Sequence, residues 1–376
     1  MGKIIAAGHI CLDITPVFPD RRGYEGIGDL LVPGKLIRME GASVHTGGSV
    51  ANTGLALKLL GNDVALLGKV GDDAFGGMIR QILAGYGAGG LITDPDSSTS
   101  YSVVLAVPGF DRMFLHDPGA NDTFSSADIP EEALQDAVLF HFGYPPIMKR
   151  MYTKTGAELT ELFRRVKAHG IATSLDLAAV DPDSEAGKAD WQAILAKALL
   201  YVDFFEPSFE ELCYMLNRPR YDALAEKGGD MTLQPGILRD AETLADACLE
   251  MGCAAVLVKC GLSGMVYRTG SRERIRSVGS RLQADPGVWA DRSGLQPCYQ
   301  AEIVRSATGA GDVSIAAFLT ALLNGESPEN CAMLAAAEGA ASVTGYDALG
   351  GILPLQELKW RIDAGWKTME VQGNAR

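Results

Sequence analysis

Ala307-Thr308-Gly309-Ala310-Gly311-Asp312 is the stretch of sequence that decides the fold, and it runs directly into an apolar helical pattern over residues 313–319. The pattern predicts a helix that begins in a glycine-rich turn. Glycines bring bare backbone N–H groups close to a ligand, and the positive end of the helix favours negative charge there. The turn is therefore predicted to hold a phosphate group.

Asp312 stands at the mouth of this predicted phosphate site. A carboxylate beside a phosphate is electrostatically unfavourable, and accepting a proton from an attacking hydroxyl is a good reason for its presence. The motif alone leaves an alternative, in which Asp312 only complements the helix dipole and the glycines only close a turn. The prediction is phosphoryl transfer, with Asp312 as general base and the backbone N–H groups of Gly309, Ala310 and Gly311 as an anion hole.

Two further segments precede this element in a fixed order. Gly47-Gly48 opens a small-residue helix pattern that stops at Gly61, and residues 67–76 predict a short buried strand that turns into another helix. With residues 308–312, this ordered set resembles the ribokinase-like (PfkB) family of carbohydrate and nucleoside kinases over about residues 3–354. The order of the three segments makes the resemblance specific.

Strand-like runs alternate with helix-like runs along the chain, which is typical of a parallel sheet covered on both faces. The predicted fold class is therefore α/β, a doubly wound, mostly parallel sheet with helices on both faces, and the resemblance adds a small β lid. The whole chain, residues 1–376, is expected to form one kinase domain. Strands are expected at residues 4–7, 64–67, 137–140, 171–175 and 255–258.

Two segments break this alternation, residues 30–45 and residues 101–116 with their Pro108-Gly109 turn. Both predict exposed β ribbons. The resemblance implies that they belong to a lid of about residues 14–46 and 98–120, which covers the substrate and pairs two copies of the chain as a homodimer. A lid would keep water away from the phosphoryl group. A plain surface hairpin is the alternative for each segment.

Composition limits the partners and cofactors. The net charge of −14 argues against nucleic acid, because a polyanion needs a basic surface. No apolar run approaches the ~20 residues that span a bilayer, so no membrane partner and a cytoplasmic location are expected. The 7 cysteines form no C-x-x-C pair and the 5 histidines show no metal-ligand spacing with them, so a structural metal is not expected.

The resemblance implies roles on the acceptor side of the site. Asp13 matches the acidic residue that holds two sugar hydroxyls, and its alternative is a turn or N-cap aspartate. Gly47 and Gly48 would let the substrate lie against the backbone, and Asn52 would bind another hydroxyl. Arg112, in the second ribbon, would either reach a charged or hydroxylated substrate or lie on the surface.

On the nucleotide side, the resemblance implies ATP contacts by Lys259, Gly261, Gly264 and Thr308. Residues 259–264 match a turn that is normally Thr-x-Gly-x-x-Gly, with Lys259 in place of the threonine. The lysine would contact the ATP phosphates or point to solvent.

Several positions depart from the family pattern. Glu211 fits the glutamate that organises magnesium-bound water, which makes Mg²⁺ the second implied cofactor, although Ser208 replaces the usual asparagine. Ser306 replaces an aspartate that helps to bind a monovalent cation, so the sequence gives no support to potassium activation. Asp176 is not followed by the Asn and Arg of an Asp-x-Asn-x-Arg motif, which weakens a hexose or sugar-acid assignment. Residues 279–300 are predicted to be an irregular insertion.

The predicted function is transfer of the ATP γ-phosphoryl group to a hydroxyl of a small carbohydrate. A nucleoside kinase of the same fold is the nearest alternative, and a non-catalytic sensor of a sugar or nucleotide is the second. A nicotinamide dehydrogenase is disfavoured because residues 8–13 lack its Gly-x-Gly-x-x-Gly fingerprint.

Overall fold

A mostly parallel sheet lies at the centre of the computed structural model, which describes residues 2–19, 26–108, 110 and 112–370. From β4 to β12 neighbouring strands are parallel, and β13 and β14 are added antiparallel at one edge. In spatial order the strands are β14 (Ser293–Gln296), β13 (Met265–Thr269), β12 (Ala255–Lys259), β11 (Phe204–Phe205), β10 (Ala172–Asp176), β9 (Ala137–Gly143), β1 (Lys3–Gly8) and β4 (Val64–Leu67).

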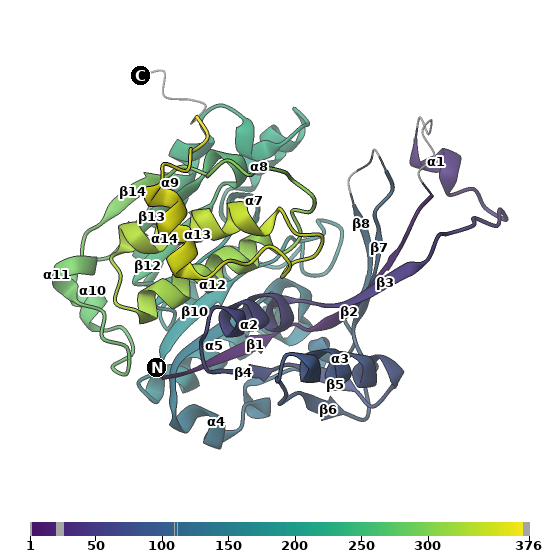
Figure 1. Cartoon of the computed structure of the whole chain (residues 1–376). Coiled ribbons are helices and arrows are strands. Elements are labelled where there is room, and N and C mark those ends of the chain that lie inside the picture. Colours follow the sequence, from purple (N-terminus) through teal and green to yellow (C-terminus); the bar gives the residue numbers. More distant parts are fainter. Residues whose placement is uncertain (1, 20–25, 109, 111, 371–376) are drawn as a thin grey trace.

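Helices cover both faces of this sheet, and β1 shows how. Ile4 and Ala6 pack into one buried cluster, whereas Ile5 and Ala7 pack into another on the opposite face. In Figure 1, α12, α13 and α14 lie together on one face. The doubly wound α/β prediction is confirmed. The first face carries α2 (Ser49–Leu59), α3 (Ala74–Gly85), α12 (Ala310–Leu323), α13 (Pro328–Ser342) and α14 (Leu355–Asp363), and the second α5 (Lys149–Ala168), α6 (Trp191–Ala198), α7 (Phe209–Leu216), α8 (Arg218–Ala225) and α9 (Ile237–Met251).

A separate four-stranded sheet, here called the lid, stands beside the main body in Figure 1. Its strands follow the order β3 (Ala42–Gly47), β2 (Cys11–Pro16), β7 (Tyr101–Leu105) and β8 (Met113–Asp117). The ribbon expected over residues 101–116 is formed by the antiparallel pair β7 and β8. Residues 20–25 of the first lid segment, and Gly109 of the expected turn, lie outside the described residues.

The ribbon expected over residues 30–45 is wrong for most of its length. Leu30 ends the short helix α1 (Ile27–Leu30), and a strand begins only at Ala42. Pro33 lacks a donor for a ladder, and Gly34 adopts a positive φ of 78°, so the intervening segment turns instead of pairing.

The stretch of residues 279–300 is also more regular than expected. It contains α11 (Pro286–Trp289) and supplies β14, the edge strand of the main sheet. Trp289 is buried against Phe204 and Phe318. The segment therefore extends the core of the fold.

Short elements complete the structure. Among the described residues, no helix is both long enough and apolar enough to cross a membrane. The remaining elements are the strands β5 (Lys69–Gly71) and β6 (Ile92–Asp94), the helices α4 (Glu131–Gln135) and α10 (Arg272–Arg276), and the 3₁₀ turns η1 (Gly119–Thr123), η2 (Ser126–Asp128), η3 (Pro145–Ile147), η4 (Met231–Leu233) and η5 (Gly261–Ser263).

Candidate active site

A cavity of about 810 Å³ opens where the parallel strands end, between the main sheet and the lid. Tyr144 directly follows β9, Asp176 ends β10 and Lys259 ends β12, so the topology brings these three side chains to one edge. Ligands of open α/β sheets bind at this carboxyl edge. Other residues that line the cavity are His9, Cys11, Asp13, Gly48, Asn52, Ser102, Phe114, His116, Glu211, Thr308, Gly309, Gly311 and Asp312.

Asp312 lies in the first turn of α12 and is 4% exposed. Thr53 donates its hydroxyl to Oδ1 at 2.9 Å, and the Asn52 amide donates to Oδ2 at 3.2 Å. The Tyr144 hydroxyl lies 2.8 Å from Oδ1 and 2.7 Å from Oδ2, so its single proton is shared between the two oxygens. The carboxylate is fixed from three directions, and the helix N-terminus favours its negative charge.

The turn before α12 takes the expected glycine geometry. Gly309 has a φ of 75°, and a Cβ there would lie 2.4 Å from Cβ of Ala348, so only glycine fits. Thr308, Gly309 and Gly311 line the cavity. The Ala310 N–H donates to the Ala307 carbonyl at 3.3 Å, which occupies one of the three amides of the predicted anion hole.

On the acceptor side, two glycines allow close approaches, one within the lid and one at its base. A Cβ on Gly47 would lie 2.1 Å from Oδ2 of Asp13, and one on Gly48 would lie 2.5 Å from the His9 carbonyl oxygen. Asp13 sits on the lid strand β2, and burial raises the pKa of its carboxyl despite hydrogen bonds from Cys11 and Ser102. Asp13, Gly48 and Asn52 line the cavity, and the amide of Asn52 is directed to Asp312.

Five predicted site residues lie outside the described cavity lining, namely Gly47, Ala310, Arg112, Gly261 and Gly264. Arg112 is in the connection between β7 and β8. Gly261 and Gly264 shape the turn between β12 and β13 with φ values of 51° and 98°. A Cβ on Gly264 would lie 2.2 Å from the Gln296 carbonyl oxygen, so this glycine allows the turn to pack against β14.

Lys259 and Asp176 form a buried ion pair within the cavity lining, with 2.8 Å between Nζ and Oδ1 and side chains 12% and 4% exposed. The end of the lysine side chain lies 3.6–3.8 Å from where a Cβ on Gly311 would be, so the cation sits beside the start of α12. Burial opposes the charge of Lys259, but the carboxylates of Asp176, Glu211 and Asp312 outweigh it and raise the pKa of the lysine.

Glu211 is placed by a capping box at the start of α7. Its Oε2 accepts the Ser208 N–H at 2.8 Å, and the Ser208 hydroxyl accepts the Glu211 N–H at 3.3 Å. Ser208 also bridges to Lys259 in the neighbouring strand. The serine that replaces the usual asparagine therefore fixes the position of Glu211 beside the cavity.

A buried hydrogen-bonded chain crosses three strands beneath the site. The Ser49 hydroxyl lies 3.3 Å from Nε2 of His141, whose Nδ1 lies 2.7 Å from the Ser174 hydroxyl, which donates to Glu206 at 2.9 Å. Burial lowers the pKa of His141 to about 3, so the ring is neutral. This chain ties the start of α2, which carries Asn52 and Thr53, to the sheet.

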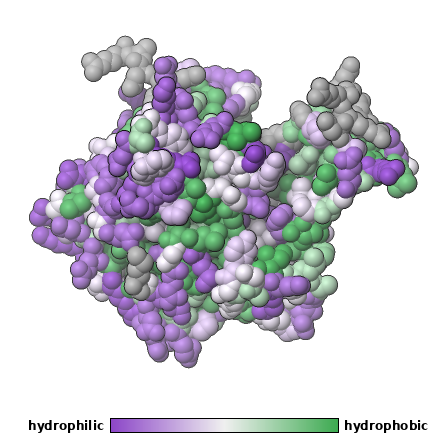
Figure 2. All heavy atoms as spheres, in the orientation of Figure 1, coloured by the Kyte–Doolittle hydropathy of each residue, from purple (hydrophilic) through white to green (hydrophobic). Residues whose placement is uncertain are grey.

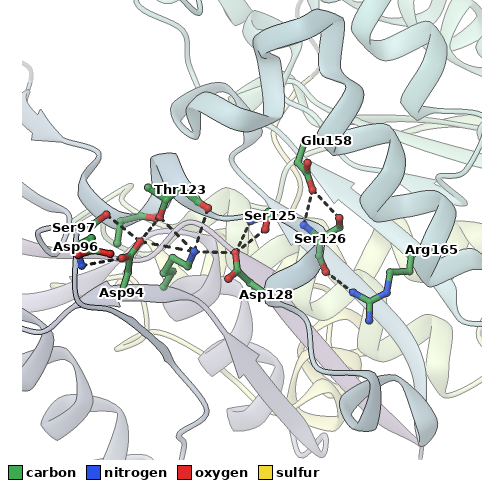
Figure 3. Close-up of polar contacts among 11 residues, drawn as sticks. Asp94, Asp96, Ser97, Thr123, Ser125, Ser126, Asp128, Glu158 and Arg165 are labelled. Carbon is green, nitrogen blue, oxygen red and sulfur yellow. Dashed lines mark hydrogen bonds and ion pairs between the residues drawn. The ribbon is translucent and has the colours of Figure 1, made fainter.

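A second polar network holds the base of the lid. Lys69 Nζ lies 2.9 Å from Oδ2 of Asp128 and 3.1 Å from the Thr123 carbonyl oxygen. In Figure 3, Asp94, Thr123 and Asp128 lie around the amine of this lysine. Ser126 donates its backbone N–H to Glu158. The adjoining Asn121 side chain pairs with both backbone groups of Ile10 at the entrance to β2.

Sequence reasoning missed the Tyr144, Thr53 and Asp176 contacts. Tyr144 is 168 positions from Asp312, and Thr53 is 259 positions from it, so no local pattern joins them. Asp176 was visible only as a departure from a family motif. The doubly wound sheet, the carboxyl-edge cavity and the buried aspartate at a helix start together define an α/β phosphotransferase.

The family model for pfkB family carbohydrate kinases matches residues 11–353. The chain belongs to this family, as the resemblance implied. A protein of Archaeoglobus fulgidus described as an uncharacterized sugar kinase is 25% identical over 303 residues, which cover 79% of this chain and 98% of that protein.

Solved structures agree on the fold. The ribokinase of Arabidopsis thaliana, complexed with ribose and ATP, aligns with a TM-score of 0.69 at 19% identity and covers 96% of this chain and 98% of its own. The nucleoside kinase of Methanocaldococcus jannaschii aligns with a TM-score of 0.65 at 19% identity, with 97% and 99% covered. At these identities the likeness supports the fold, and substrate choice depends on this chain's own residues.

Proposed function

We propose that the protein is an ATP-dependent sugar kinase in which Asp312 accepts the proton of an acceptor hydroxyl. The observation that carries the proposal is the Asp312 carboxylate, buried at the start of α12 and held by Asn52, Thr53 and Tyr144. A base fixed in this way is oriented for proton transfer as the acceptor oxygen attacks the γ-phosphorus.

The residues of the cavity fit a nucleoside triphosphate. Gly309 and Gly311 line the cavity at the start of α12, and Lys259 adds a buried cation beside it. Thr308 would contact the nucleotide directly, whereas Gly261 and Gly264 would act by shaping the β12–β13 turn. We extend the anion hole to Ala310 on the expectation that its long hydrogen bond to Ala307 yields to phosphate.

Magnesium would be held largely by the phosphates. Among the described residues, no cluster of three metal-ligating side chains occurs. Glu211, fixed by Ser208, is positioned to bind magnesium through water. When bound, Mg²⁺ supplies charge neutralisation on the phosphates.

On the acceptor side, Asp13 would accept hydrogen bonds from two hydroxyls, and Gly47 and Gly48 would let the acceptor lie against the backbone. Asn52 would act mainly by orienting Asp312, to which it already donates. Arg112 would reach the acceptor only on closure of the lid, because it lies outside the described cavity lining. A neutral small molecule with adjacent hydroxyls is the acceptor that these groups support.

The lid supports a homodimer of two such domains, each formed by residues 1–376. Leu115 on β8 is 58% exposed, on the face of the strand opposite to that of Phe114, which lines the cavity. Figure 2 shows hydrophobic surface both on the lid and on the neighbouring part of the body. A cytoplasmic location fits an enzyme that consumes ATP.

A nucleoside kinase is the second candidate, and the cavity wall favours it. Pro146, Ile147, Leu177 and Val180 line the cavity beside Tyr152, which gives an apolar surface that a free sugar would not cover. A base attached to the sugar could stack there. A non-catalytic sensor is the remaining alternative.

ADP release in the presence of Mg²⁺ and ATP, measured against pentoses, hexoses, sugar acids, polyols and nucleosides, tests these proposals. Asp312→Asn should lower kcat by about 10²–10⁴-fold, the range for removing a positioned base, with little effect on ATP affinity. Transfer that survives the substitution would remove Asp312 from the mechanism. Ligand binding without turnover across the whole panel would favour the sensor.

A further inference from the structure

In the function proposed above, Tyr144 serves only as a contact of Asp312. Its hydroxyl nevertheless contacts both carboxylate oxygens, either of which would accept the proton of the acceptor. Resting on that proposed function, we infer that Tyr144 is a specificity residue. Its hydroxyl occupies the acceptor's place on Asp312 until an acceptor displaces it, and so keeps the base from activating water.

The hydrogen bonds to Asp312 cover both oxygens of its carboxylate. An ionised carboxylate offers about four lone-pair sites. Thr53 and Tyr144 occupy Oδ1, and Asn52 and Tyr144 occupy Oδ2, at distances between 2.7 and 3.2 Å. An acceptor hydroxyl that is to give its proton to Asp312 must therefore compete with these three donors for the carboxylate.

Tyr144 is the donor that can leave. Asn52 and Thr53 lie within α2, where they are 9% and 0% exposed. Tyr144 lies outside the strands and helices of the core, between the end of β9 and η3, and it lines the cavity from which an acceptor would come. Asn52 also lines the cavity, but its place within α2 fixes it, so the phenol is the donor that an incoming hydroxyl would displace.

Tyr144 has a backbone conformation that bulky residues rarely adopt. Its φ is 72° and its ψ is 39°, a left-handed conformation that is rare for a bulky side chain and is found mainly at functional sites.

Burial, together with the charges of Asp312 and Asp176, raises the pKa of the Tyr144 hydroxyl well above its usual value. The phenol therefore stays protonated and remains a donor to Asp312 at neutral pH.

Water and an acceptor differ in the number of hydrogen bonds that they gain when they displace Tyr144 from Asp312. An acceptor gains hydrogen bonds at Asp13 and contact with Gly48, and this binding energy can drive the displacement. Water gains only the bond to Asp312 that the phenol loses. The exchange therefore favours the acceptor, which would suppress wasteful hydrolysis of ATP in an open cavity.

Tyr144→Phe tests the inference because it removes the hydroxyl and keeps the ring. With MgATP alone, ATP hydrolysis should rise by roughly tenfold, the lower end of what a hydrogen bond to a charged group contributes. With acceptor present, KM for the acceptor should fall and kcat should change little. Adding Asp312→Asn to this variant should abolish the extra hydrolysis. Tyr299→Phe is the matched control, because its hydroxyl is also hydrogen-bonded and it lies outside the described cavity lining.

A binding measurement without nucleotide gives a second readout. In calorimetric titrations with D-ribose, D-fructose and adenosine, whichever compound binds the wild type should bind Tyr144→Phe several-fold more tightly. Unchanged hydrolysis combined with a lower kcat would overturn the inference, because Tyr144 would then only orient the base. Phosphate found on Tyr144 after incubation with MgATP alone would also overturn it, because the phenol would be an acceptor itself.

The role of Asp312 and the role of Tyr144 can be tested separately. The proposed function fails if phosphoryl transfer survives Asp312→Asn, whatever Tyr144→Phe does. The present inference fails if transfer depends on Asp312 but Tyr144→Phe neither hydrolyses ATP faster nor binds acceptor more tightly than the wild type.

Discussion

We propose that Lys259 places a fixed positive charge where negative charge develops on the transferred group. Its ammonium is held by Asp176 at 2.8 Å and lies beside Gly311 at the start of α12. A preoriented cation in a buried site stabilises a transition state without having to reorganise. Asp176 acts through Lys259, as a positioning residue.

We therefore expect Lys259→Met to lower kcat by about 10²–10³-fold, the effect of losing one preorganised group. KM for the acceptor should change little, since Asp13 and Gly48 remain. Lys259→Arg, which keeps the charge, should recover part of the activity, and Lys227→Met, at an exposed position, is the control. Steady-state measurements of kcat and KM test this prediction. A fully active Lys259→Met variant would show that the lysine contributes to the structure and not to catalysis.

At the residue scale, short sequence motifs predicted the features that depend only on neighbouring residues. The turn before Asp312 and the glycines at 47 and 48 could be predicted because helix starts and close approaches demand particular residue types. The partners of Asp312 could not, because they come from α2 and from the end of β9, far away in sequence. Lys259 was visible as a substitution, but its partner Asp176 became evident only when two strand ends met at one edge of the sheet.

Among the elements, the strands of the main sheet were the most predictable. Their apolar runs are continuous because both faces are covered, and the five expected strands match β1, β4, β9, β10 and β12 closely. Three strands of the main sheet were missed, β11, β13 and β14. The two-residue strand β11 is too short, and the edge strand β14 too polar, to carry much periodicity. The lid was less predictable, because a half-exposed sheet tolerates irregular connections that the alternation of apolar and polar residues does not reveal.

Lys69 in β5 anchors the segment that follows the lid strand β8. This lysine is buried among Asp94, Asp128 and Thr123, and they connect β5 to the segments that carry η1 and η2. Removing one partner of a buried ion pair leaves uncompensated charges, which costs about 3–5 kcal/mol.

We expect Lys69→Met to lower the free energy of unfolding by about 3 kcal/mol, the lower end of this range because Asp94 and Asp128 keep 15% and 19% exposure. Chemical denaturation measures the loss, with the exposed Lys227→Met as control. Equal stability of the variant and the wild type would show that the ion pairs contribute no net stability. Lys69 lies outside the described cavity lining, so residual folded protein should keep its kcat.

On the scale of the whole molecule, an acidic chain with a net charge of −14 buries two glutamate side chains almost completely. Glu206 and Glu338 are 1% and 0% exposed. One oxygen of each, Oε1 of Glu206 and Oε2 of Glu338, has no hydrogen-bond partner among the described residues. Burial raises the pKa of both from 4.5 to about 8, so both are protonated in the folded protein at neutral pH.

This titration makes the stability of the fold depend on pH in a definite direction. Between pH 4.5 and about 8 the folded protein keeps protons on Glu206 and Glu338 that the unfolded chain has lost. The stabilisation is therefore complete below pH 4.5 and is lost as the pH rises, by about 1.4 kcal/mol per pH unit for each group.

Glu338→Gln separates this effect from other titrations, because glutamine resembles the protonated acid and cannot ionise. We expect the variant to match the wild type near pH 5 and to exceed its stability at pH 8, which should be visible as a smaller decline of Tm across that range. Glu250→Gln, at an exposed position on α9, should follow the wild-type curve. If Glu338→Gln and the wild type decline in parallel from pH 5 to pH 8, then Glu338 ionises in the folded state as readily as in the unfolded chain, and burial in α13 does not hold its proton.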